Sequence, residues 1–462
     1  MWSTLGIVSS LIKCVIMLMF VMNVAALLTW LDRRGGAMIQ DRVGPNRAMI
    51  KIGSFELRIA GLLHAAADGV KFFFKEDFMP PKADRVLFSM APILSMAPVF
   101  ALVAVLPFGD TLCYGPGLFS PAPGQSVAFV GPAAGFAAAG CPSGMTAISL
   151  AIAPLNVGIL YIFAIAGQGI IGAAIAGWSS DNKFSLMGAL RAASQMVSYE
   201  VAIGLSIVGC LMTYSTVNLT DAVRWQADNA WGIFVQPLGF LLFFVSSIAE
   251  NKRIPFDLPE AESELVSGYF TEYSGMKFGM FYLGEYAEVV TSSMILVTLF
   301  LGGWHIPFMH ANGLVLRVGE TTLMETQPWY HWAVVVTGSI AFFGKTILVC
   351  WFQHVVRWSL PRFRYDQLMR LGWTVLLPLS LGNIVVTGGV LLLIKNMSPE
   401  SQALVHTAGD LTQAFTAALG IVGLFSFGWW MGGTRRKARA VVGTPAEFAH
   451  RKGGTQTGPM QA

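Results

Sequence analysis

Long apolar runs alternate with short polar segments along most of this chain. A helix needs about 20 consecutive apolar residues to cross the hydrocarbon core of a bilayer. Runs close to that length lie near residues 4–31, 86–108, 145–177, 190–213, 233–249, 268–303, 331–353, 372–395 and 407–431. The pattern therefore predicts an all-α, polytopic membrane helix bundle with about nine transmembrane helices.

One segment between the first two runs has a different pattern. At residues 56–75, apolar side chains that include Phe73 recur on one face of a helix, and polar side chains that include Asp68 recur on the opposite face. The segment is too charged to span, so we predict an amphipathic helix on the membrane surface with its phenylalanines at the acyl boundary. Packing of this helix on neighbouring protein is an alternative, and both hold if one end guards an opening to lipid.

Composition agrees with a membrane protein. Of the 462 residues, 54% are hydrophobic and 12% are charged, whereas soluble domains carry about 25% charged residues. The first apolar run has only Lys13 inside it and lacks an A-x-A cleavage site, so it is predicted to be a true span. We predict a single transmembrane domain at residues 1–431, with 407–431 as an extra C-terminal helix, and a basic cytoplasmic tail at 432–462.

The basic residues predict an orientation. Lys and Arg concentrate in the 32–85 loop, in the 354–371 loop and in the tail, whereas the 109–144 segment contains none. Because cytoplasmic loops carry the excess of Lys and Arg, we expect a periplasmic N-terminus and a cytoplasmic C-terminus. The 32–85 segment is then a cytoplasmic loop, 109–144 an extended periplasmic loop and 250–267 an acidic cytoplasmic loop.

Carboxylates are unusually dense in RIPFDLPEAESELVSGYFTEYSG (253–275) and in MKFGMFYLGEYAEVV (276–290), which follows it. Lys277 and Glu288 share nearly the same face of an ideal helix, as do Glu285 and Glu288. Ionisable groups inside a membrane are costly and mark proton or ion pathways. We therefore predict a proton relay, with structural pairing of buried charges as the alternative. The acids concerned are Asp257, Glu260, Glu262, Glu264, Glu272, Glu285 and Glu288, together with Glu200 in a separate span.

Three arginines follow the first span, namely Arg33, Arg34 and Arg42. They are expected to anchor the span by the positive-inside rule. A second interpretation is that they neutralise carboxylates of the 253–264 loop or face a polar ligand headgroup.

Two sequence patterns argue against particular functions. Gly167-Gln-Gly169-Ile-Ile-Gly172 matches a dinucleotide-binding fingerprint, but it lies inside an apolar helix with no preceding strand, so close helix packing explains it better. None of the five cysteines has CxxC spacing, so we expect no iron–sulfur or zinc site in this chain. Cys113 and Cys141 share the predicted outer loop, where they form either a disulfide or two free thiols.

Five separated blocks resemble one family. They are RVGPNR (42–47), GLLHAAADGVKFFFKED (61–77), LRAASQMVSYE (190–200), IAENKRIPFDLPEAESELVSGYFTEYSGMKFGMFYLGEYAEVV (248–290) and RFRYDQLMRLGW (362–373). Together they resemble the H-type (subunit 1) membrane chain of proton-translocating NADH:quinone oxidoreductase, respiratory complex I. The resemblance extends from the first helix to about residue 395.

The resemblance implies a helical membrane subunit at the junction with the peripheral arm of an enzyme complex. This subunit would form much of the quinone chamber and start a chain of acidic residues toward antiporter-like subunits. The implied substrate is quinone, with no iron–sulfur cluster, flavin or metal in this chain. The implied partners are peripheral-arm and membrane subunits of complex I and membrane lipid, without nucleic acid, and the expected location is the bacterial plasma membrane.

Residue pattern and resemblance together predict two groups of functional residues. The expected quinone-binding residues are Arg33, Arg34, Arg42, Asp68, Phe73, Arg253 and Phe256. The expected proton-coupling residues are Glu200, Asp257, Glu260, Glu262, Glu264, Glu272, Lys277, Glu285 and Glu288.

The chain also departs from the family pattern. Asp32 stands where Glu is usual, His64-Ala65 replaces a typical Gln-Pro, and extra residues separate RVGPNR from the surface helix. A homologous subunit of a membrane-bound hydrogenase, or of a ferredoxin- or F420-linked complex, therefore remains an alternative. A stand-alone proton-coupled transporter is a weaker one, because no internal repeat is visible.

Overall fold

The computed structural model describes residues 4–52, 55–57, 61–114, 146–259, 262–310, 313–318, 321–325 and 331–398, and ten residues between 409 and 422. Within this part of the chain, seven helices are long and apolar enough to cross a membrane, and α8 (Pro237–Glu250) is a shorter apolar helix. The long helices are α1 (Thr4–Ile39), α3 (Arg85–Val103), α4 (Gly158–Ser179), α5 (Lys183–Tyr214), α10 (Gly275–Phe300), α11 (His331–Ser359) and the continuous run of α12 (Tyr365–Arg370), η2 (Leu371–Leu376) and α13 (Leu377–Lys395).

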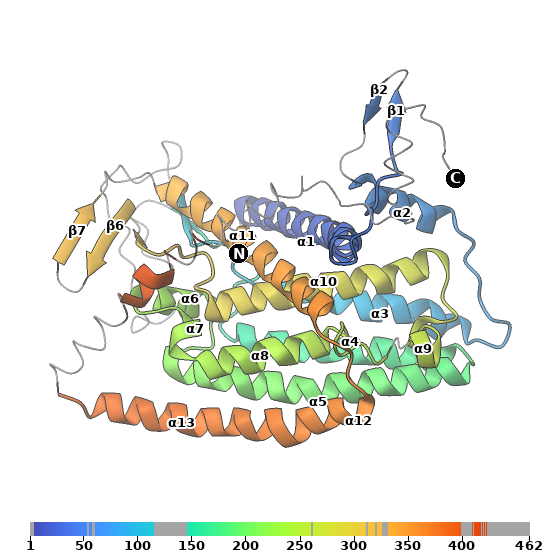
Figure 1. Cartoon of the computed structure of the whole chain (residues 1–462). Coiled ribbons are helices and arrows are strands. Elements are labelled where there is room, and N and C mark those ends of the chain that lie inside the picture. The colour runs from blue at the N-terminus through green and yellow to red at the C-terminus, as the bar shows by residue number, and fades with distance from the viewer. Residues whose placement is uncertain are drawn as a thin grey trace, which may run out of the picture.

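These helices form one elongated bundle with α13 along one edge beside α5 (Figure 1). The all-α membrane architecture is therefore confirmed, and the eight helices match eight of the nine predicted spans. The two ends of the bundle differ. The α2 end carries α2 (Leu63–Phe74), α9 (Glu262–Leu265) and η1 (Gly268–Phe270), and the β6 end carries β6 (Gly313–Val318) and β7 (Thr321–Glu325) (Figure 1).

Small antiparallel sheets lie in the segments that connect the helices. β5 (Met309–His310), β6 and β7 form a three-stranded sheet in that order. β3 (Leu112–Tyr114) pairs with β4 (Thr146–Ile148), and β1 (Ile50–Ile52) pairs with β2 (Phe55–Leu57). Two short helices, α6 (Leu219–Asp228) and α7 (Gly232–Val235), lie at the β6 end before α8.

Several predicted boundaries are wrong. The helix predicted at 56–75 begins only at Leu63, because 55–57 is a strand and Gly61 turns the chain with a positive φ of 90°. The span predicted from 145 begins at Gly158, after strand β4 and a loop. The first helix continues through Ile39, so part of the predicted 32–85 loop is helical.

Part of the predicted C-terminal helix can be placed. Residues 409, 411–416, 418, 420 and 422 are helical, whereas the rest of 407–431 and the tail lie outside the described residues. The Gln413 amide donates hydrogen bonds to the carbonyl oxygens of Ala227 (3.3 Å) and Asn229 (3.2 Å). Carbonyls at a helix C-terminus lack intrahelical partners, so Gln413 caps α6. Cys113 is disulfide-bonded, and Cys141 lies outside the described residues.

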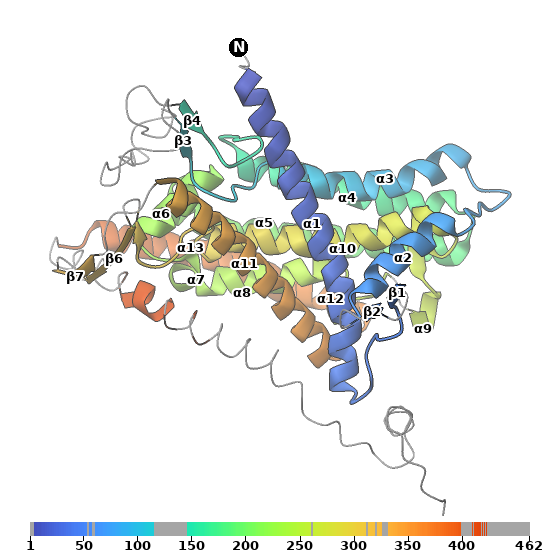
Figure 2. The ribbon, with the colours of Figure 1, turned by 90° about the horizontal axis from the view of Figure 1, so that it is seen from above.

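Helix α10 is the buried axis of the bundle. Every residue from Gly284 to Phe300 is buried except Glu288, which is half-buried. Helices α1, α3, α8 and α11 contact α10, and α1 crosses it in the view of Figure 2. A polar side chain on this helix is therefore enclosed by protein.

Small residues let neighbouring segments approach closely. A Cβ on Gly172 would lie 2.6 Å from the backbone nitrogen of Ser95 in α3, and a Cβ on Gly188 would lie 2.7 Å from the Cα of Gly268. Gly172 belongs to the GxGxxG pattern, so the packing interpretation of that pattern is confirmed. Such backbone contacts leave no room for a methyl group.

We predict that Gly188→Ala destabilises the protein by about 1–3 kcal/mol, since the added methyl overpacks against backbone. The matched control is Gly204→Ala in the same helix, where the nearest atom to the new Cβ is 3.9 Å away. Thermal unfolding of the purified protein should show a lower midpoint for Gly188→Ala only. Equal midpoints for the two variants would contradict the packing argument.

Candidate functional site

The site is built around two carboxylates on α10 and two cations from the loop after α8. Nζ of Lys252 lies 3.3 Å from Oε2 of Glu288, and its side chain is 1% exposed. Nη2 of Arg253 lies 3.5 Å from Oε2 of Glu285, which is also buried. Because Glu285 and Glu288 are three residues apart, they share one helix face. Two adjacent loop residues therefore compensate two acids one turn apart.

Backbone conformation directs these cations inward. Lys252 has a positive φ of 55°, so the chain turns immediately after α8. The side-chain amide of the preceding residue, Asn251, donates a 2.9 Å hydrogen bond to the hydroxyl of Ser292 on α10. The loop is thereby held against the central helix, and Lys252 and Arg253 reach its carboxylates.

Aromatic side chains complete the surroundings of Glu285. The Tyr269 hydroxyl donates a 3.1 Å hydrogen bond to Oε1 of Glu285. The guanidinium of Arg253 lies 4.0 Å from the ring centroid of Tyr286, a cation–π contact. The Tyr286 hydroxyl in turn donates a 2.6 Å hydrogen bond to Asp32 on α1. A continuous polar network thus links α1 to α10.

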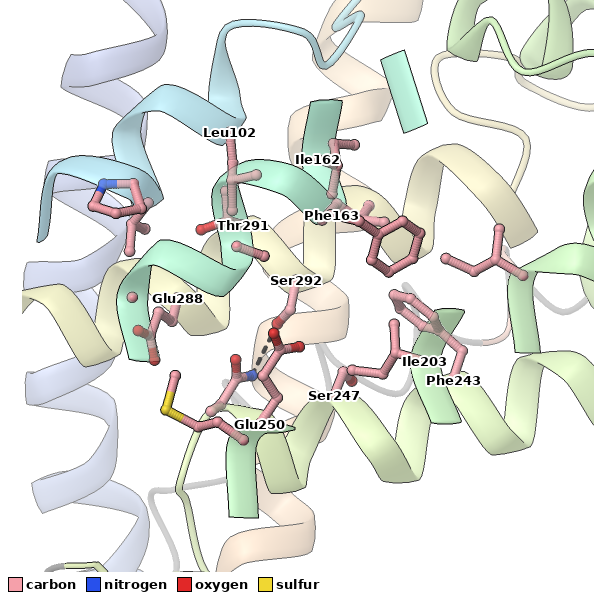
Figure 3. A pocket seen from close by; sticks show the side chains of 18 residues that line it. Leu102, Ile162, Phe163, Ile203, Phe243, Ser247, Glu250, Glu288, Thr291 and Ser292 are labelled. Carbon is pink, nitrogen blue, oxygen red and sulfur yellow. Dashed lines mark hydrogen bonds between the residues drawn. The ribbon is translucent and has the colours of Figure 1, made fainter. Parts of the chain in front are cut away.

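A cavity opens beside Glu288 (Figure 3). Its volume for the centres of water molecules is about 70 Å³. A single water occupies roughly 10–15 Å³, so the cavity has space for several waters. Polar groups of Ser247, Glu250, Asn251 and Ser292 line one part of it, and the remainder is mostly apolar.

Glu250, the last residue of α8, is a carboxylate that the sequence interpretation did not single out. It lines the cavity together with Glu288 (Figure 3) and lies within electrostatic range of Glu288 and Glu200. Its position at the polar end of an apolar run was the available signal. Glu200 on α5 lies against α4, where a Cβ on Gly167 would be 3.3 Å from its Oε1. Within the described residues, neither Glu250 nor Glu200 has a cation at ion-pair distance.

The other predicted acids lie apart from this cluster. Glu272 accepts a 2.6 Å hydrogen bond from the Asn182 amide, and Glu264 forms a 2.7 Å ion pair with Arg191 at the surface. The Arg191 hydrogen bond lowers the pKa of Glu264. Glu260 and the side chain of Glu262 lie outside the described residues.

Lys277 does not join the predicted polar stripe. Its Nζ lies 3.0 Å from Oδ2 of Asp77 and 5.3 Å from the Phe88 ring centroid. Glu288 is instead paired with Lys252. Sharing a helix face was insufficient, because Lys277 lies eleven positions before Glu288 and meets a partner from the loop after α2.

Asp257 lies in the loop near the cations of the cluster. Burial and the nearby Glu285 raise its pKa from 3.8 to about 6, although Arg362 and Arg253 oppose the shift. Its Oδ1 is buried without a hydrogen-bond partner. A carboxyl of this kind changes charge near neutral pH, as a proton-handling group requires.

The predicted quinone-binding residues divide into three groups. Arg33 on α1 and Asp68 on α2 form a 2.6 Å ion pair, and Phe73 is 73% exposed. Arg34 lies over the ring of Trp30, and Arg42 donates to Gln40. Arg253 belongs to the carboxylate cluster, and Phe256 is packed in the core, stacked on Phe363 at 5.5 Å. Only Arg33, Asp68 and Phe73 therefore lie at the contact of α1 with α2 or on the exposed face of α2.

The fold and the site define a polytopic membrane protein with ion-paired carboxylates at its centre. A family model described as NADH dehydrogenase matches residues 12–388. The chain is 41% identical to the first H-type subunit of the NADH-quinone oxidoreductase of Cytophaga hutchinsonii over 365 residues, 79% of this chain and 91% of that protein. It is also 41% identical to the second H-type subunit of Geobacter metallireducens (82% and 95% covered) and to the H-type subunit of Flavobacterium johnsoniae (84% and 96%). The chain belongs to the H-type subunit family of NADH-quinone oxidoreductase, respiratory complex I.

Membership makes this chain a multi-pass membrane subunit of an enzyme complex, with other complex I subunits as its partners. The predicted family is confirmed. Among the described residues, no group of three or more His, Cys, Asp or Glu side chains could hold a metal ion.

We predict a pH-dependent effect of Asp257→Asn on stability. The pKa of Asp257 in the fold lies above its value in the unfolded chain, so burial destabilises the charged form fully above about pH 6 and not at all below about pH 4. A shift of this size corresponds to roughly 3 kcal/mol. Asn should raise the unfolding midpoint clearly at about pH 8, about half as much at about pH 5 and hardly at all below about pH 4. A gain of equal size at both pH values would contradict the assignment.

Proposed function

We propose that this subunit forms part of the quinone chamber at its α2 end and couples quinone reduction to proton translocation through its buried carboxylates. The observation that carries the proposal is the set of loop cations paired with Glu285 and Glu288 beside a cavity that Glu250 also lines. The two ion pairs keep these acids ionisable inside a membrane protein. Ionisable residues within membrane segments mark ion and proton pathways. Membership of a family of NADH-quinone oxidoreductase subunits supports quinone as the substrate.

The quinone path would pass between α1 and α2. Phe73 and Phe74 on α2 are 73% and 87% exposed, and no residue of that helix is buried. The other face of α2 meets α1 through the Arg33–Asp68 pair and α10 through Phe72, whose ring centroid is 5.9 Å from that of Phe278. One face thus suits lipid and the other suits protein, as expected of a helix that borders an opening to the bilayer.

The proton route would run from the loop after α8 to the cavity. Asp257 is at its loop end, Glu285 and Glu288 follow on α10, and Glu250 at the end of α8 and Glu200 on α5 come next. Waters in the cavity would connect Glu288 with Glu250, and Glu200 lies within electrostatic range of Glu250. Glu272 and Glu264 would contribute nearer the surface, and Glu262 and Glu260 stay predicted members of the route.

We propose that the α2 end is cytoplasmic and that the membrane is the bacterial plasma membrane. Support comes from the basic residues between Arg33 and Arg85, of which the described ones lie at or near this end, and from the near absence of basic residues in the loops at the β6 end. The peripheral arm would then meet the α2 end, where the acidic loop 250–267 is located.

Glu288→Gln tests the proton route. We expect NADH:quinone turnover of the assembled complex to fall about 100-fold, at the lower end of what a proton-transferring group contributes, because Gln cannot take up or release a proton. Turnover and proton-to-electron ratio would be measured in proteoliposomes. Asp221→Asn on α6 at the β6 end is the carboxylate control. Unchanged turnover in Glu288→Gln would sink the proposed route.

Phe73→Asp tests the quinone path. A charge on the lipid-facing side of α2 should hinder access of a long-tailed quinone from the bilayer and raise its apparent KM, since a charged group disfavours an apolar boundary. A water-soluble short-chain quinone serves as the internal control, and its KM should change less. Equal effects on both quinones would argue against a lipid-side opening at α2.

A further inference from the structure

A buried histidine lies next to the carboxylate network without being part of the proposed route. His354 on α11 is 5% exposed, and its ring stacks with that of Tyr286 at 6.3 Å between centroids. Helices α1 and α11 lie over α10 and converge toward the end where His354 and Asp32 are found (Figure 2). The two side chains therefore meet between α1, α10 and α11.

The hydrogen-bond partners of His354 fix where its proton lies. Nδ1 is 2.7 Å from the carbonyl oxygen of Cys350. A carbonyl oxygen only accepts hydrogen bonds, so Nδ1 must carry the hydrogen, and in the neutral ring Nε2 is then a bare acceptor. Nε2 lies 3.5 Å from Oδ1 of Asp32.

Within the described part of the chain, one carboxylate oxygen of Asp32 lacks a hydrogen-bond donor. Its Oδ2 accepts from the Tyr286 hydroxyl and forms an ion pair with Arg357. Its Oδ1 is buried and has no hydrogen-bond partner. Two acceptors, a ring nitrogen and a carboxylate oxygen, thus face each other in a buried place, which is unfavourable unless a hydrogen lies between them.

We propose that His354 and Asp32 form a proton-loading pair, which binds one proton between Nε2 and Oδ1. The added charge acts electrostatically on the Arg253–Glu285 pair. The pair would act through the network already described, so the proposal rests on the proposed proton route. Loading forms one N–H bond on His354, or one O–H bond on Asp32, and makes the pair more positive by one charge. The proton comes from water at the α2 end, which Arg357 reaches with a side chain that is 27% exposed.

The charged groups around the pair explain how its protonation would affect the Arg253–Glu285 ion pair. Arg357 is on the same helix as His354, Tyr286 comes from α10, and Arg253 comes from the loop after α8 and lies over the Tyr286 ring. A proton added to the pair repels Arg253. Arg253 also pairs with Glu285, so loading strengthens that ion pair and unloading weakens it.

The test uses the pH profile of NADH:quinone turnover in the purified complex. His354→Gln keeps a hydrogen-bonding side chain but cannot bind the proton, and Asp32→Asn removes the carboxylate. Each should lose the same titration step that the unmodified complex shows, and the double variant should lose no more than either single variant. Asp32→Glu keeps a carboxylate and should keep the step.

His305→Gln is the matched control, because His305 is also a buried histidine but lies near Trp231. Its pH profile should equal that of the unmodified complex. If His354→Gln prevents assembly, the comparison of Asp32→Asn with Asp32→Glu carries the test. An unmodified profile in His354→Gln or in Asp32→Asn, or additive losses in the double variant, would overturn the proposal. If Glu288→Gln still lowers turnover in that case, the proton route itself survives.

Discussion

The structure depends on the compensation of two negative charges that helix α10 carries into the centre of the bundle. α10 is buried along most of its length, yet it carries Glu285 and Glu288, whose charges Arg253 and Lys252 compensate. A buried ion pair contributes little net stability, but removing one partner costs about 3–5 kcal/mol because the other charge stays uncompensated. The loop after α8 is therefore fixed in place by the acids it neutralises. The positive φ of Lys252 and the Asn251–Ser292 hydrogen bond follow from the same requirement.

Within the described part of the chain, two of the buried carboxylates are paired with cations, and two others nearby are not. Glu285 and Glu288 have cations at contact distance, whereas Glu250 and Glu200 have none among the described residues, and the cavity adjoins Glu250. Like charges this close cannot all be ionised without cost. An excess of carboxyl groups over cations beside space for water is the condition under which protons can be exchanged among acids. Under the proposed function, the ion pairs set the charge at one end of the route and the cavity provides the exchange at the other.

Hydropathy was sufficient to predict the helices, because a span of about 20 apolar residues has one physical solution in a bilayer. It failed where tertiary contacts decide the outcome. The strand at 55–57 depends on pairing with Ile50–Ile52, and helical periodicity concealed it. The carboxylates of α10 were recognisable from sequence, but their partners were not. Lys277 is nearer to Glu288 in sequence than Lys252 is, yet in the fold Lys277 pairs with Asp77 and Lys252 pairs with Glu288. Glu250 was missed although it stands at the polar end of an apolar run, and His354 was missed because its partner Asp32 lies far away in the sequence.

The same loop connects both charged regions, and this limits how they can behave. Arg253 contacts Glu285 directly and reaches Asp32 through Tyr286, while its neighbour Lys252 holds Glu288. A movement of this loop must therefore change the surroundings of three carboxylates at once. Asp257, four residues beyond Arg253, has its pKa near 6 and senses Glu285. A change of charge on Asp257 thus acts on the cations that compensate α10, so an event at the surface of the α2 end would reach the centre of the bundle without any helix having to move.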